Sequence, residues 1–255
     1  MVVSFFCRSS SILSAVRTGI SYSYILLFFT LLLCPCKLGL GEAIQIDSIE
    51  ELQKIGNDPL YPLDGNYELT QDIDASETIS WNNGEGFAPI GGYDNPFVGT
   101  FDGKGFTIEN LYISLPTVPG EENGGIFSIV GETGVIKDLS LENAYIGGGY
   151  RYMGGIAGIN FGLIVGCSVR GSIVSNTGAG GLVGSNNGVI LDSHFLGNVT
   201  GSGFVGGIAG ANDGDYGRPA TIENCYVLGK ITLRGSSSAG GIAGWGRGGK
   251  VKNCY

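Results

Sequence analysis

The chain has 255 residues, of which 47 are glycine and 8 are proline, and its formal net charge at pH 7 is −9. The glycines follow no three-residue period, which excludes collagen, and 43% hydrophobic residues provide enough apolar surface for a folded core, which excludes a disordered chain. The acidic balance makes nucleic acid a poor partner.

Residues 1–43 have the pattern of an export signal. Arg8 and Arg17 precede an uncharged apolar run at 25–33, and small residues come just before position 44. Because the run is short for a membrane span, we expect a cleaved signal peptide, with an uncleaved signal anchor or a later start codon as alternatives. The pattern predicts a secreted or cell-surface protein that meets the membrane only through this N-terminal segment.

Residues 44–123 are expected to form an N-terminal cap and the first coils of a stacked β structure. Ser48 and Glu51 form a capping box, and Gly56 is placed to end the helix that they begin. Three apolar residues share one face of this helix: Ile49, Leu52 and Ile55. A short amphipathic helix of this kind can cover the open end of a stack. Strand-like runs follow at 65–74 and 99–108, separated by a loop-like stretch at 81–96.

The same glycine-rich phrase occurs five times in residues 124–255. Its copies begin at residues 124, 154, 180, 206 and 240, so successive copies are 30, 26, 26 and 34 residues apart. Repetition at this interval indicates supersecondary units that stack on one another. We interpret the phrase as structural, at coil corners where a positive φ or a close backbone approach requires glycine. The glycines assigned to this role are Gly154, Gly155, Gly158, Gly180, Gly181, Gly184, Gly206, Gly207, Gly210, Gly240, Gly241 and Gly244.

Between the phrases, apolar or small residues alternate with polar ones, as in a strand with one buried face. Three units align position by position, for example at Ile164, Ile190 and Ile222. Equivalent strands would pair in parallel, and the handedness of crossover connections favours a right-handed coil. We therefore predict an all-β fold, a right-handed parallel β-helix with a short N-terminal capping helix. A second aligned set, Asn160, Asn186 and Asn212, predicts a structural side-chain ladder.

The repeated phrases resemble the GLUG motif family, whose Gly-Leu-x-Gly core stands here as Gly181-Leu182-Val183-Gly184, with isoleucine variants in the other units. The segment with Pro89-Ile90-Gly91 and 97–105 also looks like the region that precedes such repeats. The family's repeats occur in exported bacterial surface proteins, in adhesin-like chains and beside the protease domain of immunoglobulin-A-cleaving metalloproteases. The resemblance implies a surface or secreted β-helical scaffold, and it transfers no catalytic residue.

Two neighbouring columns carry the chemistry of the repeat. Cys167, Ser193, Cys225 and Cys254 share one position, which we interpret as a buried column of small residues, with a disulfide between Cys225 and Cys254 as an alternative. One position later, alternation directs a polar and aromatic strip outward: Ser168, His194, Tyr226 and Tyr255. His194, Tyr226 and Tyr255 could bind a sugar or a protein partner through their rings.

The carboxylates give a weaker signal. Asp213 and Asp215 lie in a glycine-containing loop that could hold Ca²⁺, although the loop lacks the spacing of a full calcium site. His194 is the single histidine, which excludes a zinc-protease helix motif. We assign no catalytic residue, no cofactor and no confident metal site. A polysaccharide lyase or hydrolase is the enzyme alternative, because β-helices host both classes.

The sequence thus predicts an exported, non-catalytic scaffold for adhesion to a host or cell-surface protein or glycan, with a carbohydrate-binding module as the alternative. The last residues, Asn253-Cys254-Tyr255, fall midway through a unit. From the regular repeat we expect either further chain or another molecule at that edge.

Overall fold

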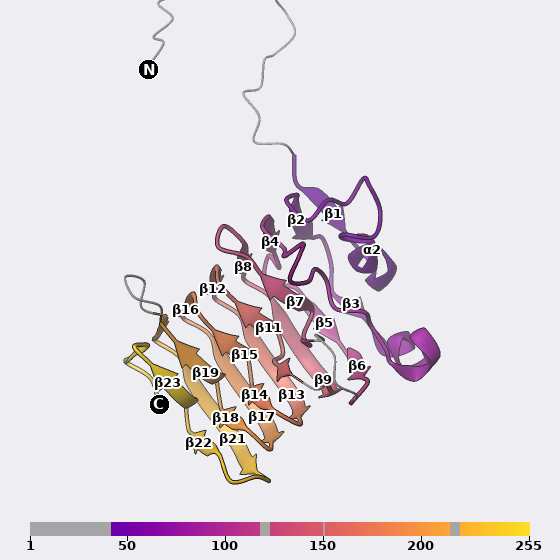
Figure 1. Cartoon of the computed structure of the whole chain (residues 1–255). Helices are drawn as coiled ribbons and strands as arrows, with labels where there is room; N and C mark the ends of the chain where they lie inside the picture. The colour runs from indigo at the N-terminus through magenta and orange to yellow at the C-terminus, as the bar shows by residue number, and fades with distance from the viewer. Residues whose placement is uncertain (1–41, 118–122, 150, 215–219) are drawn as a thin grey trace, which may run out of the picture. The chain divides into compact units, whose positions relative to one another are not determined.

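The computed structural model describes residues 42–117, 123–149, 151–214 and 220–255 (Figure 1). The predicted export signal lies almost wholly outside this part of the chain and stays a prediction. From Ala43 to Tyr255 the chain forms one unit, in which parallel strands of successive coils pair into four sheets. This arrangement confirms the predicted parallel β-helix.

Sheet A is the longest of the four and runs the length of the unit. Its strands, in order of pairing, are β1 (Ile44–Ile46), β2 (Asn66–Leu69), β4 (Thr100–Asp102), β8 (Val135–Lys137), β12 (Leu163–Val165), β16 (Val189–Leu191), β20 (Thr221–Glu223) and β24 (Lys250–Lys252). Sheet B holds β3 (Ile73–Asp74), β5 (Thr107–Glu109), β9 (Ser140–Gly148), β13 (Ser168–Ser175), β17 (His194–Gly201) and β21 (Tyr226–Leu233), with β6 (Tyr112–Leu115) also paired to β9.

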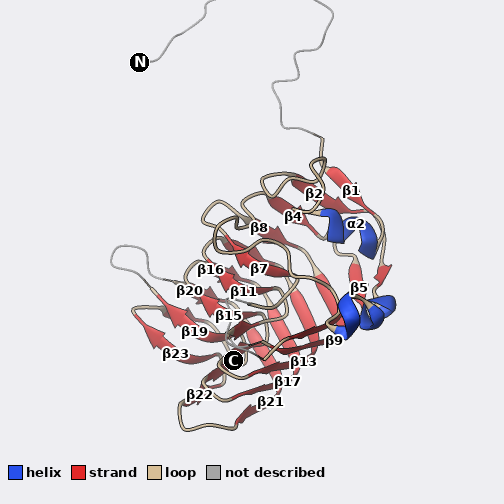
Figure 2. Ribbon diagram, turned by 45° about the vertical axis from the view of Figure 1, so that its right-hand side comes forward, coloured by secondary structure: helices blue, strands red, loops and turns tan. Residues whose placement is uncertain are grey.

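The two remaining sheets complete each coil. Sheet C contains β7 (Phe127–Val130), β11 (Ala157–Asn160), β15 (Val183–Asn186), β19 (Ala209–Asp213) and β23 (Ala243–Arg247). Sheet D contains β10 (Tyr152–Met153), β14 (Gly178–Gly180), β18 (Phe204–Gly206) and β22 (Ser238–Gly240). A full coil therefore visits sheets A, B, D and C in turn, and Figure 2 shows the strands of successive coils stacked side by side.

The register of the coils agrees with the alignment of the units. Ile164 pairs with Ile190, and Ile190 pairs with Ile222. All three side chains are fully buried, as are the corresponding valine and phenylalanine of sheet B, Val169 and Phe195. The alternation of side chains thus places one residue type per column into a continuous core, which is how successive coils bury the apolar face that a single unit leaves open.

A short helix covers the N-terminal end of sheet A, as expected. The helix α2 spans Ile49–Lys54, and the Ser48 hydroxyl caps it by accepting the Glu51 backbone N–H at 3.3 Å. Ile49, Leu52 and Ile55 are at most 2% exposed and join the same core as the strands. Gly56 follows with φ +80°, the left-handed conformation that ends a helix. Figure 2 shows α2 beside β1, the first strand of sheet A. Two 3₁₀ helices follow, at Ser76–Ser80 and Asn82–Gly84.

The sequence predicts two reasons for glycine in the repeated phrases, a positive φ and a close backbone approach, and the structure shows only the second. None of the twelve assigned glycines has a positive φ, so the left-handed alternative is wrong. Close approach applies at eleven of the twelve, Gly241 being the exception; a Cβ at Gly181, for example, would lie 2.2 Å from both the Gly207 carbonyl oxygen and the Phe195 ring. Corner placement is also incomplete. The last glycine of a phrase lies within sheet C, where a Cβ at Gly184 would lie 2.6 Å from the Met153 nitrogen of sheet D.

The predicted asparagine ladder is present inside sheet C. The Asn160 amide donates to the Asn186 side-chain oxygen at 2.9 Å, and the Asn186 amide donates to Asn212 at 2.9 Å. Each of the three side chains is at most 2% exposed. The ladder satisfies buried amides that would otherwise destabilise the stack, and it fixes the register from coil to coil.

Candidate functional site

The outward face of sheet B presents the strip that the sequence pointed to. In-register pairing aligns Ser140, Ser168, His194 and Tyr226 on successive strands, and Tyr255 extends the row. The imidazole of His194 stacks on Tyr226 with ring centres 4.5 Å apart and planes 5° apart. Tyr226 stacks in turn on Tyr255 at 5.6 Å and 12°. We call this row the aromatic ladder.

Stacking within the ladder decides what the rings can contact. Both ring faces of Tyr226 lie against neighbouring rings, and one face of His194 does so, because the strand spacing equals the distance at which aromatic rings pack. A sugar that stacks on an aromatic side chain needs a free ring face. His194 and Tyr226 therefore offer mainly their edges, whereas Tyr255 is 80% exposed. Binding through these three residues stays a prediction.

Partial burial also sets the protonation of His194. Desolvation lowers the pKa of its imidazole, Glu142 raises it by a smaller amount, and Arg170 lowers it further. The ring is consequently neutral near pH 7. The ion pair between Arg170 Nε and Glu142 Oε2, at 2.8 Å, occupies the next row of the same face. Within the described part of the chain, Glu142 acts on His194 only through its charge, and no side-chain hydrogen bond joins the imidazole to a carboxylate or a nucleophile, so the geometry there gives it no general-acid or general-base partner.

The remaining outward rows of sheet B mix apolar, aromatic and charged side chains. Tyr112 stacks on Tyr145 with ring centres 5.2 Å apart, and Leu228 is 60% exposed. Lys230 pairs with Asn198 across the strands, and its side chain is exposed. The face therefore offers outward side chains in regularly spaced rows.

The calcium candidate is only half visible. Asp213 ends β19 and is half-buried, while Asp215 lies outside the described residues. Among the residues that the structure describes, no group of three or more histidine, cysteine, aspartate or glutamate side chains could hold a metal ion. The structure thus adds nothing to the weak sequence signal for Ca²⁺ at these positions.

The cysteine column lies where the sequence placed it. Cys167 and Cys225 are fully buried, and Ser193 continues the column by accepting the Cys167 backbone N–H at 3.0 Å. Desolvation raises the pKa of the Cys167 thiol to about 12, so it is neutral and unreactive. Cys225 and Cys254 are free thiols, with the Cys225 N–H directed at the Cys254 sulfur at 3.4 Å. The disulfide alternative is not observed in this state.

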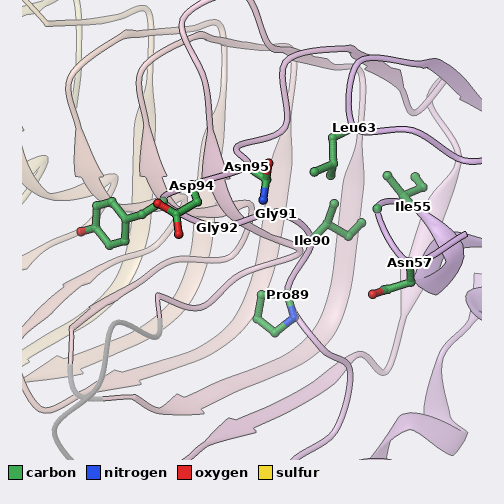
Figure 3. Close-up of a pocket in the computed structure, with 11 residues that line it drawn as sticks. Ile55, Asn57, Leu63, Pro89, Ile90, Gly91, Gly92, Asp94 and Asn95 are labelled. Carbon is green, nitrogen blue, oxygen red and sulfur yellow. The ribbon is translucent and has the colours of Figure 1, made fainter. Parts of the chain in front are cut away.

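Sequence reasoning missed a groove near the N-terminal cap. It has a volume of about 360 Å³ and lies between the end of α2 and the loop at 89–95 (Figure 3). The loop falls in the stretch at 81–96 that the sequence predicts to be irregular, and no repeat pattern marks it. The available signal was local: Tyr93-Asp94-Asn95 places an aromatic ring, a carboxylate and an amide together, directly after two glycines.

Comparison with known proteins identifies one repeat directly. The family model described as "The GLUG motif" matches residues 201–232, which include the phrase that starts at Gly206. Residues of the other phrases pair in register with this unit, because β15 and β23 both flank β19. In the described residues, no helix has both the length and the apolar character needed to span a bilayer.

Two relatives place the repeat in context. Halomucin of Haloquadratum walsbyi is 40% identical over 132 residues, which are 51% of this chain and 1% of halomucin. A putative Gly-rich membrane protein of Evansella cellulosilytica is 33% identical over 108 residues, 40% of this chain and 12% of that protein. The chain therefore spans only a small part of these relatives.

The crystal structure of a putative immunoglobulin A1 protease from Bacteroides ovatus has a TM-score of 0.58 to this chain at 20% identity, covering 84% of this chain and 74% of the other. At this identity the likeness concerns the fold alone. Together with the parallel strand pairing, these comparisons identify the chain as a parallel β-helix that carries a GLUG motif.

Proposed function

We propose that this chain is an exported, cell-surface or secreted scaffold for adhesion, and that it has no catalytic activity of its own. The observation that supports the proposal best is the outward face of sheet B. Strands of eight residues, β13, β17 and β21, pair along their whole length there and hold outward side chains in fixed rows. A rigid, flat face of this kind suits contact with a large partner, because it orders its contact groups before binding.

The comparisons support this proposal at a coarser level. The model of the GLUG motif matches residues 201–232, and the name of one relative describes it as a putative membrane protein. The exported location rests on the pattern of residues 1–43. The proposal of a non-catalytic role is supported by the aromatic ladder, where His194 stacks on Tyr226 and bonds no acid or base among the residues that the structure describes.

The location can be tested with the full chain carrying a C-terminal epitope tag in a bacterium that exports proteins. We expect the tag in the medium or open to protease on intact cells. Substituting Leu31→Arg and Leu32→Arg should keep the tag inside, because the apolar run would be broken. Retention of the unaltered chain inside intact cells would refute the exported location.

Adhesion can be tested with beads coated with the full chain on immobilised fibronectin, laminin and mucin. We expect attachment to at least one surface, and at least a tenfold loss of attachment for the double variant Leu228→Glu and Lys230→Glu. Both side chains are exposed on sheet B, so the fold should not change. Leu60→Glu is the matched control, because Leu60 is 77% exposed away from that sheet. Equal attachment by all variants would contradict a role for this face.

The enzyme alternative is tested by incubating the chain with a panel of polysaccharides and measuring reducing ends and unsaturated products. Product formation above that of heat-denatured chain would refute the non-catalytic proposal.

A further inference from the structure

The groove near the N-terminal cap has rigid walls. The Gln53 side chain of α2 makes two hydrogen bonds to the backbone of Ala88, donating to its carbonyl at 3.0 Å and accepting its N–H at 2.9 Å. The loop is joined to β7 on its other side, where Ile90 N–H donates to the Ile126 carbonyl at 2.8 Å and Phe97 N–H donates to Ile129 at 3.0 Å. These contacts preform the groove in the absence of a ligand.

The loop between these anchors is a tight turn directed at solvent. Gly91 has φ +78°, and the Gly92 N–H donates to the Asn95 carbonyl at 3.0 Å. A Cβ at Gly92 would meet no atom within 4 Å, so the space above the turn is open. The absent side chain of Gly92 thus leaves room for a ligand beside the turn, whereas a Cβ at Gly91 would lie 3.1 Å from the Phe97 nitrogen.

The groups around the opening combine an apolar wall with polar side chains. Leu63 and Ile90 form part of the wall, and Figure 3 shows Asn57, Asp94 and Asn95 around the same space. The Asp94 carboxylate and the Asn95 amide make no hydrogen bond to other described residues, and both are exposed. They are available to bind hydroxyl groups.

An exposed aromatic ring stands beside these polar groups. Tyr93 is 43% exposed, and the guanidinium of Arg151 lies over its ring at 5.8 Å from the ring centre. Arg151 also donates to the Tyr93 hydroxyl at 3.4 Å. A cation over the ring restrains it, and unlike the ladder rings, Tyr93 stacks on no other aromatic ring among the described residues.

Charge and size restrict the ligand. Asp94 is the one charged residue among those that line the groove, and the guanidinium of Arg151 lies outside this lining, against Tyr93. An acidic group placed beside Asp94 would be repelled by its carboxylate, whereas hydroxyl donors would pair with the carboxylate and the Asn95 amide. The volume of about 360 Å³ falls within the range of small-molecule sites, roughly 300–1,000 Å³.

We infer that this groove binds a neutral saccharide, with a sugar ring on Tyr93 and its hydroxyls on Asp94 and Asn95. This site is separate from the aromatic ladder, where the rings of His194 and Tyr226 cover one another. The inference does not depend on the scaffold role, because saccharide binding is measured on the chain in solution, without an adhesion surface.

The test is an array of neutral oligosaccharides, including cellotriose, maltotriose and N,N′-diacetylchitobiose, with sialyllactose as the acidic probe. The full chain is applied, and hits are measured by calorimetry. We expect binding of at least one neutral probe and none of sialyllactose. Gly92→Leu should abolish binding by filling the groove, and Tyr93→Ala should weaken it at least tenfold. Gly92→Ala is the smaller control at the same position, and circular dichroism with the thermal midpoint checks that each variant folds.

Tyr255→Ala separates the groove from the aromatic ladder, since it removes an exposed tyrosine at the other end of the unit. We expect unchanged saccharide binding in this variant. Binding that survives Gly92→Leu, or that is lost in Tyr255→Ala and kept in Tyr93→Ala, would overturn the inference. So would the failure of the unaltered chain to bind any neutral probe, or equal binding of sialyllactose.

Discussion

The asparagine ladder allows a quantitative test of what holds the coils in register. In Asn186→Ala, five groups lose a hydrogen-bond partner: the Asn160 amide, the Gly188 N–H, the Asn212 side-chain oxygen and the carbonyls of Gly188 and Thr221. The Gly188 N–H and the Asn212 oxygen have no other partner among the described residues. The Gly188 N–H loses the side-chain oxygen that it reaches at 3.3 Å, and the Asn212 oxygen loses its amide donor at 2.9 Å. The Asn160 amide keeps weaker contacts to the carbonyls of Gly162 and Val189.

Each buried group left unpaired costs about 1–3 kcal/mol, so we expect the free energy of unfolding to fall by about 4 kcal/mol. For a unit of this size, that loss corresponds to a drop in the thermal midpoint of roughly 8–16 °C. Urea unfolding followed by circular dichroism measures the change.

The neighbouring residue provides the control. The Asn187 side chain is only half-buried and donates to the Ser185 hydroxyl at 3.2 Å, while its backbone N–H bond to Asn160 survives truncation. Asn187→Ala should cost under about 1 kcal/mol. If the two variants differed by less than about 0.5 kcal/mol, the ladder would not stabilise the stack as argued.

Three further predictions concern the glycines, the histidine and the cysteines. Gly181→Ala should lower the free energy of unfolding by at least about 2 kcal/mol. Gly241→Ala, at the same repeat position, should lower it little, because a Cβ there meets nothing within 4 Å. Equal decreases in urea unfolding would contradict close approach as the cause. A proton NMR titration should give His194 a pKa below its usual value of 6.5. As the pH drops, the histidine of the unfolded chain is protonated before that of the folded chain. The free energy of unfolding therefore falls below pH 6.5 and becomes constant below the folded-state pKa. A measured pKa above 6.5 would reverse this dependence on pH. Iodoacetamide at pH 8 should alkylate Cys254 before Cys167, because the Cys167 thiol is buried and has a pKa of about 12. Peptide mass spectrometry reports the order of labelling. Early labelling of Cys167 would show that the core opens.

The coil could be predicted from the sequence wherever equivalent positions of successive units occupy the same structural environment. Ile164, Ile190 and Ile222 align because each occupies the same site in a stack of parallel strands, so periodicity carries three-dimensional information directly. The capping helix was equally predictable, since Ser48 and Glu51 act within one turn of the chain. Local and repeated interactions are the ones that a single sequence reveals.

The geometry of sites was less accessible, for two physical reasons. Alternation showed that His194 and Tyr226 point outward, but it gave no indication that their rings are close enough to cover one another's faces. The groove escaped notice because it forms between segments with no shared period, when the Gln53 side chain joins α2 to the loop at Ala88. Contacts of this kind depend on tertiary packing that neither segment encodes alone.

The division between stack and loop also explains where new chemistry can arise in this fold. An inward residue such as Asn186 is bonded to the coil on either side, so a change there must be matched in the neighbouring coils. The loop that contains Tyr93 is joined to the coil by backbone bonds at Ile90 and Phe97, and Tyr93, Asp94 and Asn95 between them are exposed. Substitutions in that loop alter a binding surface without altering the register. Specificity should therefore vary among β-helices of this type in the loops that leave the coil, while the stacked columns stay nearly constant.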